Sequence, residues 1–213
     1  MSNASRQRGM SLIELMVASS VSLLAIGAVG SVYVQGQKVV TERTRQLVLR
    51  QNVNDAVRLI AEDLLRAGYS ERGKSIKLSG ASSVVNLSSG GDTWADFVYQ
   101  APDGSWDVIG IAKKSAGGNK PYDWLKMCKT DGTPPLTTDV YATELAGFCP
   151  SFTGGDALLD SQLIQVDAFN ITEEVVSSSS ATSQKLTVQL TASLPATGES
   201  YSKEKAVLLR NWR

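Results

Sequence analysis

An apolar segment near the N-terminus constrains this chain more than any other feature. Residues 10–34, MSLIELMVASSVSLLAIGAVGSVYV, carry a single charged side chain, that of Glu14. A helix of about 25 residues rises roughly 37 Å, which exceeds the roughly 30 Å thickness of the hydrocarbon core of a bilayer. The segment therefore predicts one helix that is long enough to cross a membrane.

The residues before this segment predict its orientation. Residues 1–9 are short and polar, and Arg6 and Arg8 are their only charged side chains. Basic residues on one side of a span favour the cytoplasm for that side. We therefore expect a cytoplasmic N-terminus, with the rest of the chain outside the membrane.

Two ordinary interpretations of the apolar segment are incomplete. A cleaved secretory signal has a shorter apolar stretch, a cleavage site after it and no internal carboxylate. A plain membrane anchor fits the length but leaves Glu14 unexplained, because a carboxylate at bilayer depth costs about 2.5–3.5 kcal/mol and implies a partner. A position close to the hydrated interface is the alternative that would lower this cost.

The start of the segment favours a third interpretation. The sequence GMSLIELMVA, residues 9–18, resembles the cleavage and methylation motif of type IV prepilins. In that family an inner-membrane prepilin peptidase cuts after the leader glycine and methylates the new N-terminal amine. The resemblance implies cleavage between Gly9 and Met10, N-methylation of Met10, and an assembly role for Glu14. The family usually has Phe where this chain has Met10.

The chemistry of this cleavage explains why a glutamate would follow it closely. Cutting after Gly9 leaves a positive amine in an apolar environment, where the carboxylate of Glu14, from the same or a neighbouring subunit, can neutralise it. A buried charge is tolerated when paired, and removal of one partner leaves the other unpaired at a cost of several kcal/mol. We therefore expect Glu14 to set the axial register of a subunit that enters a fibre.

The helical pattern continues beyond the apolar segment. No proline occurs before Pro102, and apolar residues recur every three or four positions, which predicts an amphipathic helix over 35–68. Gly68 is expected to end this helix in the left-handed conformation. The apolar positions of the stripe are Leu49, Val53, Val57, Ile60 and Leu64.

The end of the expected helix narrows the family. The sequence AVRLIAEDLLRAGY, residues 56–69, resembles the corresponding part of PilW-like minor pilins. This resemblance implies a low-abundance subunit that helps to prime type IV pili, and the fibre tip is one location that it implies. Implied partners are the prepilin peptidase, other minor and major pilins, the inner membrane and its assembly platform. The alternatives are a J-type pseudopilin of a type II secretion system and a tip adhesin or DNA-uptake pilin.

Residues 69–213 are expected to form a β-rich periplasmic domain. A hairpin is predicted from residues 95–101 and 106–113 around the turn signal Pro102-Asp103-Gly104. Further strands are predicted over 163–172, 185–194 and 205–212. The expected fold is α+β, with the long helix packed on an antiparallel sheet as in type IV pilins.

Cys128 and Cys149 are expected to form a disulfide if the domain is exported, with two buried free thiols as the alternative. The chain has no histidine, so the commonest general base and metal ligand are missing. The balanced charge, 21 basic and 21 acidic residues, argues against a broad nucleic-acid surface. We therefore expect no catalytic, cofactor or metal site, no nucleic acid and no small-molecule substrate.

Overall fold

The computed structural model describes residues 11–71, 73, 75–88, 93–132, 140–145, 149, 154–177 and 182–210. Gly9 and Met10 lie outside these residues, so cleavage after Gly9 and methylation of Met10 stay predictions. The chain divides into two compact units, residues 1–47 and 48–213.

One helix, α1, extends over Leu12–Leu64. In the first unit its apolar side chains are exposed along the whole described length, including Leu12, Leu24 and Tyr33. By length and composition this helix is sufficiently apolar to cross a membrane. The predicted long N-terminal helix is therefore present.

The C-terminal end of α1 differs slightly from the expectation. Regular helix ends at Leu64, and the next residues form tighter bonds, with the N–H of Ala67 donating to the carbonyl of Leu64 at 3.1 Å. Gly68 then adopts a φ of 73°, which confirms the predicted left-handed position. Its N–H donates to the carbonyl of Val98 at 2.9 Å, so the helix end is bonded directly to a strand.

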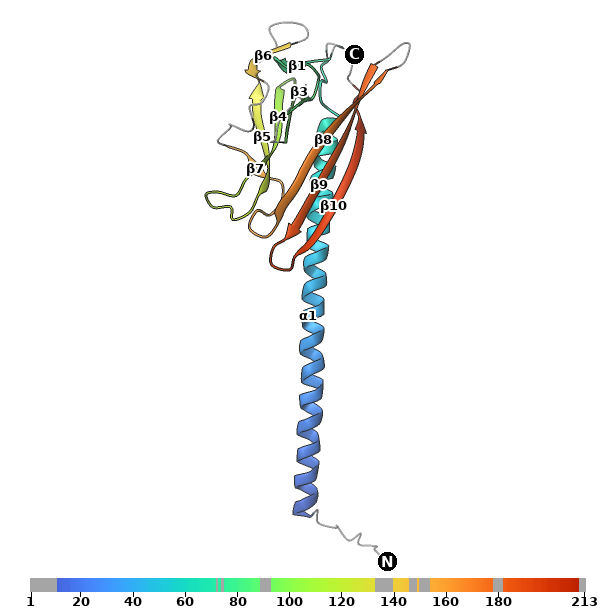
Figure 1. Cartoon of the computed structure of the whole chain (residues 1–213), viewed down its shortest axis with the longest axis vertical. Helices are drawn as coiled ribbons and strands as arrows, with labels where there is room; N and C mark the ends of the chain where they lie inside the picture. The colour runs from blue at the N-terminus through green and yellow to red at the C-terminus, as the bar shows by residue number, and fades with distance from the viewer. Residues whose placement is uncertain are drawn as a thin grey trace, which may run out of the picture. The chain divides into compact units, whose positions relative to one another are not determined.

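The second unit contains three groups of strands (Figure 1). A five-stranded antiparallel sheet has the order β2-β3-β4-β5-β7, and a three-stranded antiparallel sheet has the order β10-β9-β8. Two further strands, β1 and β6, pair in parallel. The bounds are β1 Lys77–Ser79, β2 Asn86–Leu87, β3 Trp94–Gln100, β4 Trp106–Lys114, β5 Trp124–Gly132, β6 Val140–Leu145, β7 Asp156–Ala157, β8 Gln165–Ser177, β9 Thr182–Leu194 and β10 Glu199–Leu208.

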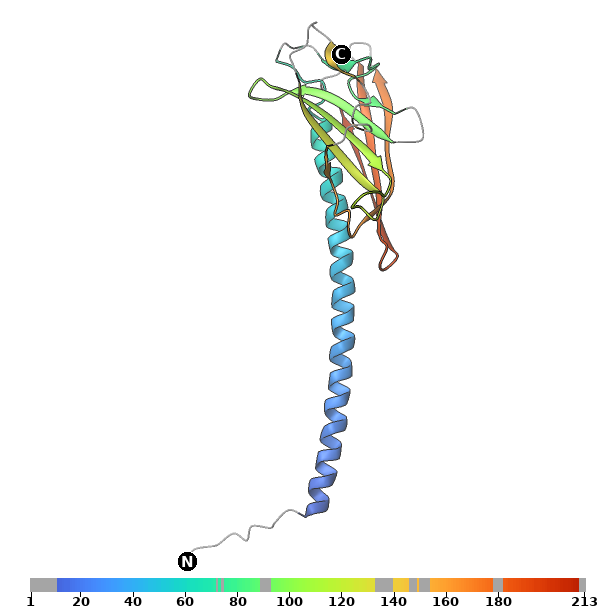
Figure 2. The same ribbon diagram turned by 90° about the vertical axis from the view of Figure 1, so that its left-hand side faces the viewer.

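Both larger sheets pack on the C-terminal part of α1, as the two views of the ribbon show (Figures 1 and 2). The five apolar positions predicted for the helix stripe are all buried. They share one core with Phe97 and Ile109 of the five-stranded sheet and with Phe169 and Val188 of the three-stranded sheet. This arrangement confirms the α+β fold, with the β-structure divided between sheets where one sheet was expected.

The strand predictions are accurate where side chains alternate around the core. The predicted hairpin corresponds to β3 and β4, and the strand predicted over 185–194 corresponds to β9. The strand predicted over 205–212 is displaced, because β10 begins at Glu199, directly after a tight turn from β9. Residues 211–213 lie outside the described part of the chain.

Candidate functional site at the N-terminal end of the helix

Glu14 lies in the first turn of α1, and its side chain folds back toward the start of the helix. Its Oε2 accepts a hydrogen bond from the backbone N–H of Ser11 at 3.1 Å. The carbonyl of Ser11 accepts the first helical bond, from Leu15, at 3.2 Å. A glutamate three residues after a serine at a helix start forms this contact in a capping box. Local structure thus holds the carboxylate beside the residue that follows Met10.

The surroundings of Glu14 are apolar. Leu12, Ile13, Leu15 and Met16 are each at least 60% exposed, so the carboxylate stands within an exposed hydrophobic surface. Glu14 is the only charged side chain between residues 11 and 37. A cation that pairs with Glu14 at membrane depth must therefore come from the chain before residue 11 or from another molecule.

The serines of the apolar segment satisfy their hydroxyl groups within the helix. Ser19 and Ser20 both donate to the carbonyl of Met16, at 2.9 and 2.8 Å. Ser22 donates to Ala18, and Ser31 to Ala28, each at 2.8 Å. A hydroxyl bonded to its own helix does not need water. These serines are thus compatible with lipid or with neighbouring helices, whereas the carboxylate of Glu14 would need a charged partner at membrane depth.

A charged group in the second unit, missed in the sequence, joins the end of α1 to the five-stranded sheet. Arg66 lies 3.4 Å from Asp63, and its guanidinium lies 5.9 Å from the centre of the Tyr99 ring. Beside them, Lys129 Nζ lies 3.0 Å from Asp107 Oδ2. The spacing of three residues between Asp63 and Arg66 indicates a local ion pair at the end of α1. The residues around this pair come from β3, β4 and β5, which are distant in sequence.

Burial and pairing shift the titration of this group. Loss of hydration raises the pKa of Asp63, an effect that Arg66 partly opposes. Burial also raises the pKa of Tyr99. The hydrogen bond to Asp107 raises the pKa of Lys129. The arrangement pairs its charges internally, so we assign it to stability rather than to chemistry.

The predicted disulfide between Cys128 and Cys149 is present, with Cα atoms 5.7 Å apart. Both cysteines are fully buried. They lie against Gly110 of β4, where an added Cβ would collide with the Cβ of Cys149 and come within 2.7 Å of Asp96 Oδ1. A glycine inside a strand often marks such a close approach. The bond ties β5 to a segment that follows β6.

No arrangement suited to catalysis stands out in the described residues. A polar recess lies between β4, β8 and the residue that precedes β5, and its charged groups pair with one another or with the backbone, since Lys113 pairs with Asp123 at 3.3 Å and donates to the carbonyl of Asp167 at 2.9 Å. The described part of the chain contains no group of three or more acidic or cysteine side chains placed to hold a metal ion.

Two family models match the chain. The model described as prepilin peptidase-dependent protein B matches residues 42–209, which includes nearly all of the second unit. The model described as the prokaryotic N-terminal methylation motif matches residues 4–30, which includes Gly9, Met10 and Glu14. Comparison with curated proteins and with solved structures gives no match.

Proposed function

The chain belongs to the prepilin peptidase-dependent protein B family and is a type IV prepilin-like protein, and from this premise we propose that it is a PilW-like minor pilin. In this proposal it takes part in priming and assembly of type IV pili and has a place at or near the fibre tip. The observation that carries the proposal is Glu14, the only charge between residues 11 and 37, held by Ser11 at the start of an exposed apolar helix.

The proposed maturation begins with the leader, residues 1–9. The prepilin peptidase cuts between Gly9 and Met10 and methylates the amine of Met10. Residues 10–34 then lie in the inner membrane, residues 35–68 contain the rest of the helix and the turn that follows Leu64, and residues 69–213 form the periplasmic domain. Arg6 and Arg8 favour this orientation. The disulfide supports it as well, because such bonds persist in oxidising compartments.

Assembly in this proposal depends on one charge pair. The amine of Met10 and the carboxylate of Glu14 meet in the apolar interior formed by packed helices, where each would be costly alone. The subunit would be recruited through the inner-membrane assembly platform and would contact other minor and major pilins. The domain then leaves the membrane with the fibre and reaches the cell surface.

The first test is the N-terminus of the protein from cells with and without the prepilin peptidase. Intact mass and N-terminal analysis should show a chain that begins at N-methylated Met10, and this form should disappear without the peptidase. A chain that still begins at Met1, or one cut beyond Ser31, would contradict the proposal.

The second test separates the charge of Glu14 from its contact with the helix start. Glu14→Gln keeps an acceptor for the N–H of Ser11 but removes the charge. We expect incorporation into sheared fibres to fall about tenfold or more, with cleavage after Gly9 unchanged. Glu42→Gln removes an exposed carboxylate outside the apolar segment and serves as the control.

The same fibres distinguish the proposal from a secretion pseudopilin. A minor pilin is found in sheared surface pili and is needed for their number. A J-type pseudopilin would undergo the same cleavage, but its loss would impair protein secretion and leave surface pili intact.

A further inference from the structure

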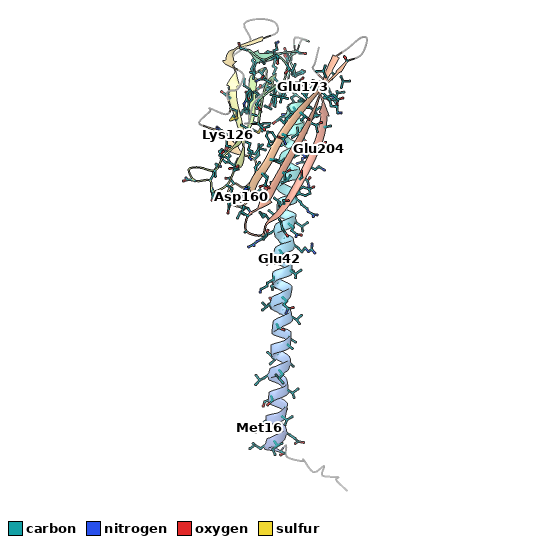
Figure 3. The ribbon with its side chains drawn as sticks, in the orientation of Figure 1. Met16, Glu42, Lys126, Asp160, Glu173 and Glu204 are labelled. Carbon is teal, nitrogen blue, oxygen red and sulfur yellow. A yellow bond between two sulfur atoms is a disulfide. The ribbon has the colours of Figure 1, made fainter. Side chains whose placement is uncertain are left out.

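The two edges of the three-stranded sheet have different chemistry. The outer strand β10 has consecutive exposed charged side chains at Lys203, Glu204 and Lys205, and Figure 3 labels Glu204 on this strand. Charged residues on an edge strand disfavour pairing with another strand. The edge formed by β10 is therefore protected against further pairing.

The opposite edge, β8, leaves the core before it ends. On the face that packs inward, Phe169 is buried and Ile171 is half-buried, whereas Glu173 and Val175 are exposed. All of residues 172–177 are exposed, and Val175 retains 56% of its accessible surface. In Figure 1 this end of β8 and the facing end of β9 project beyond the other strands. We call residues 172–177 the free end of β8.

The free end has pairing capacity on one side only. Every residue from Ala168 to Ser177 pairs with β9, and β8 is the outer strand of its sheet. On the side of β8 that faces away from β9, the backbone hydrogen bond seen in the described residues lies at the other end of the strand, where the N–H of Val166 donates to the carbonyl of Asp123. Alternate N–H and C=O groups of an edge strand point outward. The free end therefore offers a template for a strand.

The charges of the free end select the kind of strand. Glu174 is paired with Lys185 of β9 at 2.8 Å, so its charge is satisfied within the sheet. Glu173 is exposed and lies on the other face, opposite buried Leu186. In an antiparallel pairing of two copies whose axis lies between Glu173 and Glu174, Glu173 of each chain would face Glu174 of the other. Like charges placed opposite one another disfavour pairing.

From these observations we infer that the free end of β8 binds an extended strand from a different polypeptide, which places a Lys or Arg beside Glu173 and an apolar side chain beside Val175. Backbone hydrogen bonds supply the attachment, and the two side-chain positions supply the selectivity. The inference rests on the proposed function in one respect, namely that the partner is another subunit of the same fibre or priming complex.

The test uses the full chain in its native membranes, with a photo-crosslinking amino acid at Thr172 or at Val176. The control places it at Ala206, which is exposed on the protected edge of β10. We expect an adduct with another pilin-motif subunit whose crosslinked peptide contains Lys or Arg. Its yield should exceed that at Ala206 by about tenfold.

Two substitutions test the chemistry of the contact. Glu173→Lys should lower the adduct at Thr172 by about tenfold, because it removes the acidic partner of the basic residue. Val175→Lys should lower the yield of the adduct similarly, because it places a charge where the partner has an apolar side chain. Retention of the Cys128–Cys149 disulfide in each variant shows that the domain has folded.

Three results would each overturn the inference: a yield no greater than at Ala206, an adduct with a second copy of this chain, or a yield that Glu173→Lys leaves unchanged. The N-terminus of the same samples is measured in parallel. A chain that begins at Met10 but shows any of these results refutes the strand contact alone, whereas a chain that begins at Met1 refutes the proposed function.

Discussion

Lys129 of β5 reaches diagonally across to β4 and places its Nζ 3.0 Å from Oδ2 of Asp107, a carboxylate whose side chain is only 8% exposed. Tyr99 lies directly opposite Asp107 on β3, and Arg66 at the end of α1 lies over the Tyr99 ring. The contact thus belongs to the charged group that joins helix and sheet.

We expect Lys129→Met to lower the free energy of unfolding by about 1–3 kcal/mol, because it leaves the buried carboxylate of Asp107 without its cation. Urea denaturation at neutral pH measures the change. Lys205→Met, an exposed position on β10, should stay within about 0.5 kcal/mol of the parent. The hydrogen bond raises the pKa of Lys129, so its contribution is complete below the ordinary lysine pKa and is lost as pH rises through the folded value. The difference between the parent and Lys129→Met should therefore shrink at alkaline pH.

Asp63 should show a pH dependence of the same sign as that of Lys129, but in the acidic range. Burial raises its pKa, so the folded protein binds a proton more readily than the unfolded chain does. The contribution of Asp63 to the free energy of unfolding therefore increases as pH falls through its folded pKa toward the ordinary aspartate pKa of 3.8. Asp63→Asn, which cannot titrate, should change stability at neutral pH by no more than about 1 kcal/mol. Relative to this variant the parent should gain stability on mild acidification, and a parallel pH profile of both proteins would contradict the assignment.

The elements predicted from the sequence are those with a local or periodic signal. The stripe from Leu49 to Leu64 follows the helical repeat, and Gly68 combines a helix end with a residue that tolerates positive φ. The Cys128–Cys149 bond followed from the export that the apolar segment predicts, together with the absence of other cysteines.

The strand bounds and contacts that the sequence did not predict lack such a signal. β10 is exposed along most of its length, so its residues do not alternate between core and solvent, and its start at Glu199 is set by pairing with β9. The inward face of β8 turns polar at Glu173, which hides its continuation to Ser177. The neighbours of Asp63 and Arg66 are distant in sequence, and only the fold of β3, β4 and β5 brings them together.

Gly68→Ala should be among the more damaging single changes in the second unit. A side chain at φ 73° is strained, and the added Cβ would lie 2.5 Å from Cγ1 of Val84. Gly68 also donates to Val98 and accepts from the N–H of Ile76 at 3.1 Å, so a shift of its backbone would disturb both bonds. We expect a loss of about 2–4 kcal/mol in thermal or urea unfolding. Gly104 has a similar φ of 82° but open space around it. Gly104→Ala should therefore lose less stability, and its loss measures the backbone strain without the collision.

Reduction of the disulfide provides a final test of the second unit. Cys128 and Cys149 are 21 residues apart, and closing a loop of this size stabilises by about 3 kcal/mol in the chain-entropy model. The double variant Cys128→Ser/Cys149→Ser should therefore unfold with a free energy about 2–4 kcal/mol lower than that of the parent. Reductant added during urea unfolding should destabilise the parent by a similar amount and leave the double variant unchanged, which separates loss of the bond from loss of sulfur packing at Gly110. If the parent unfolded identically with and without reductant, the bond would make no contribution, and its stabilising role would have to be abandoned.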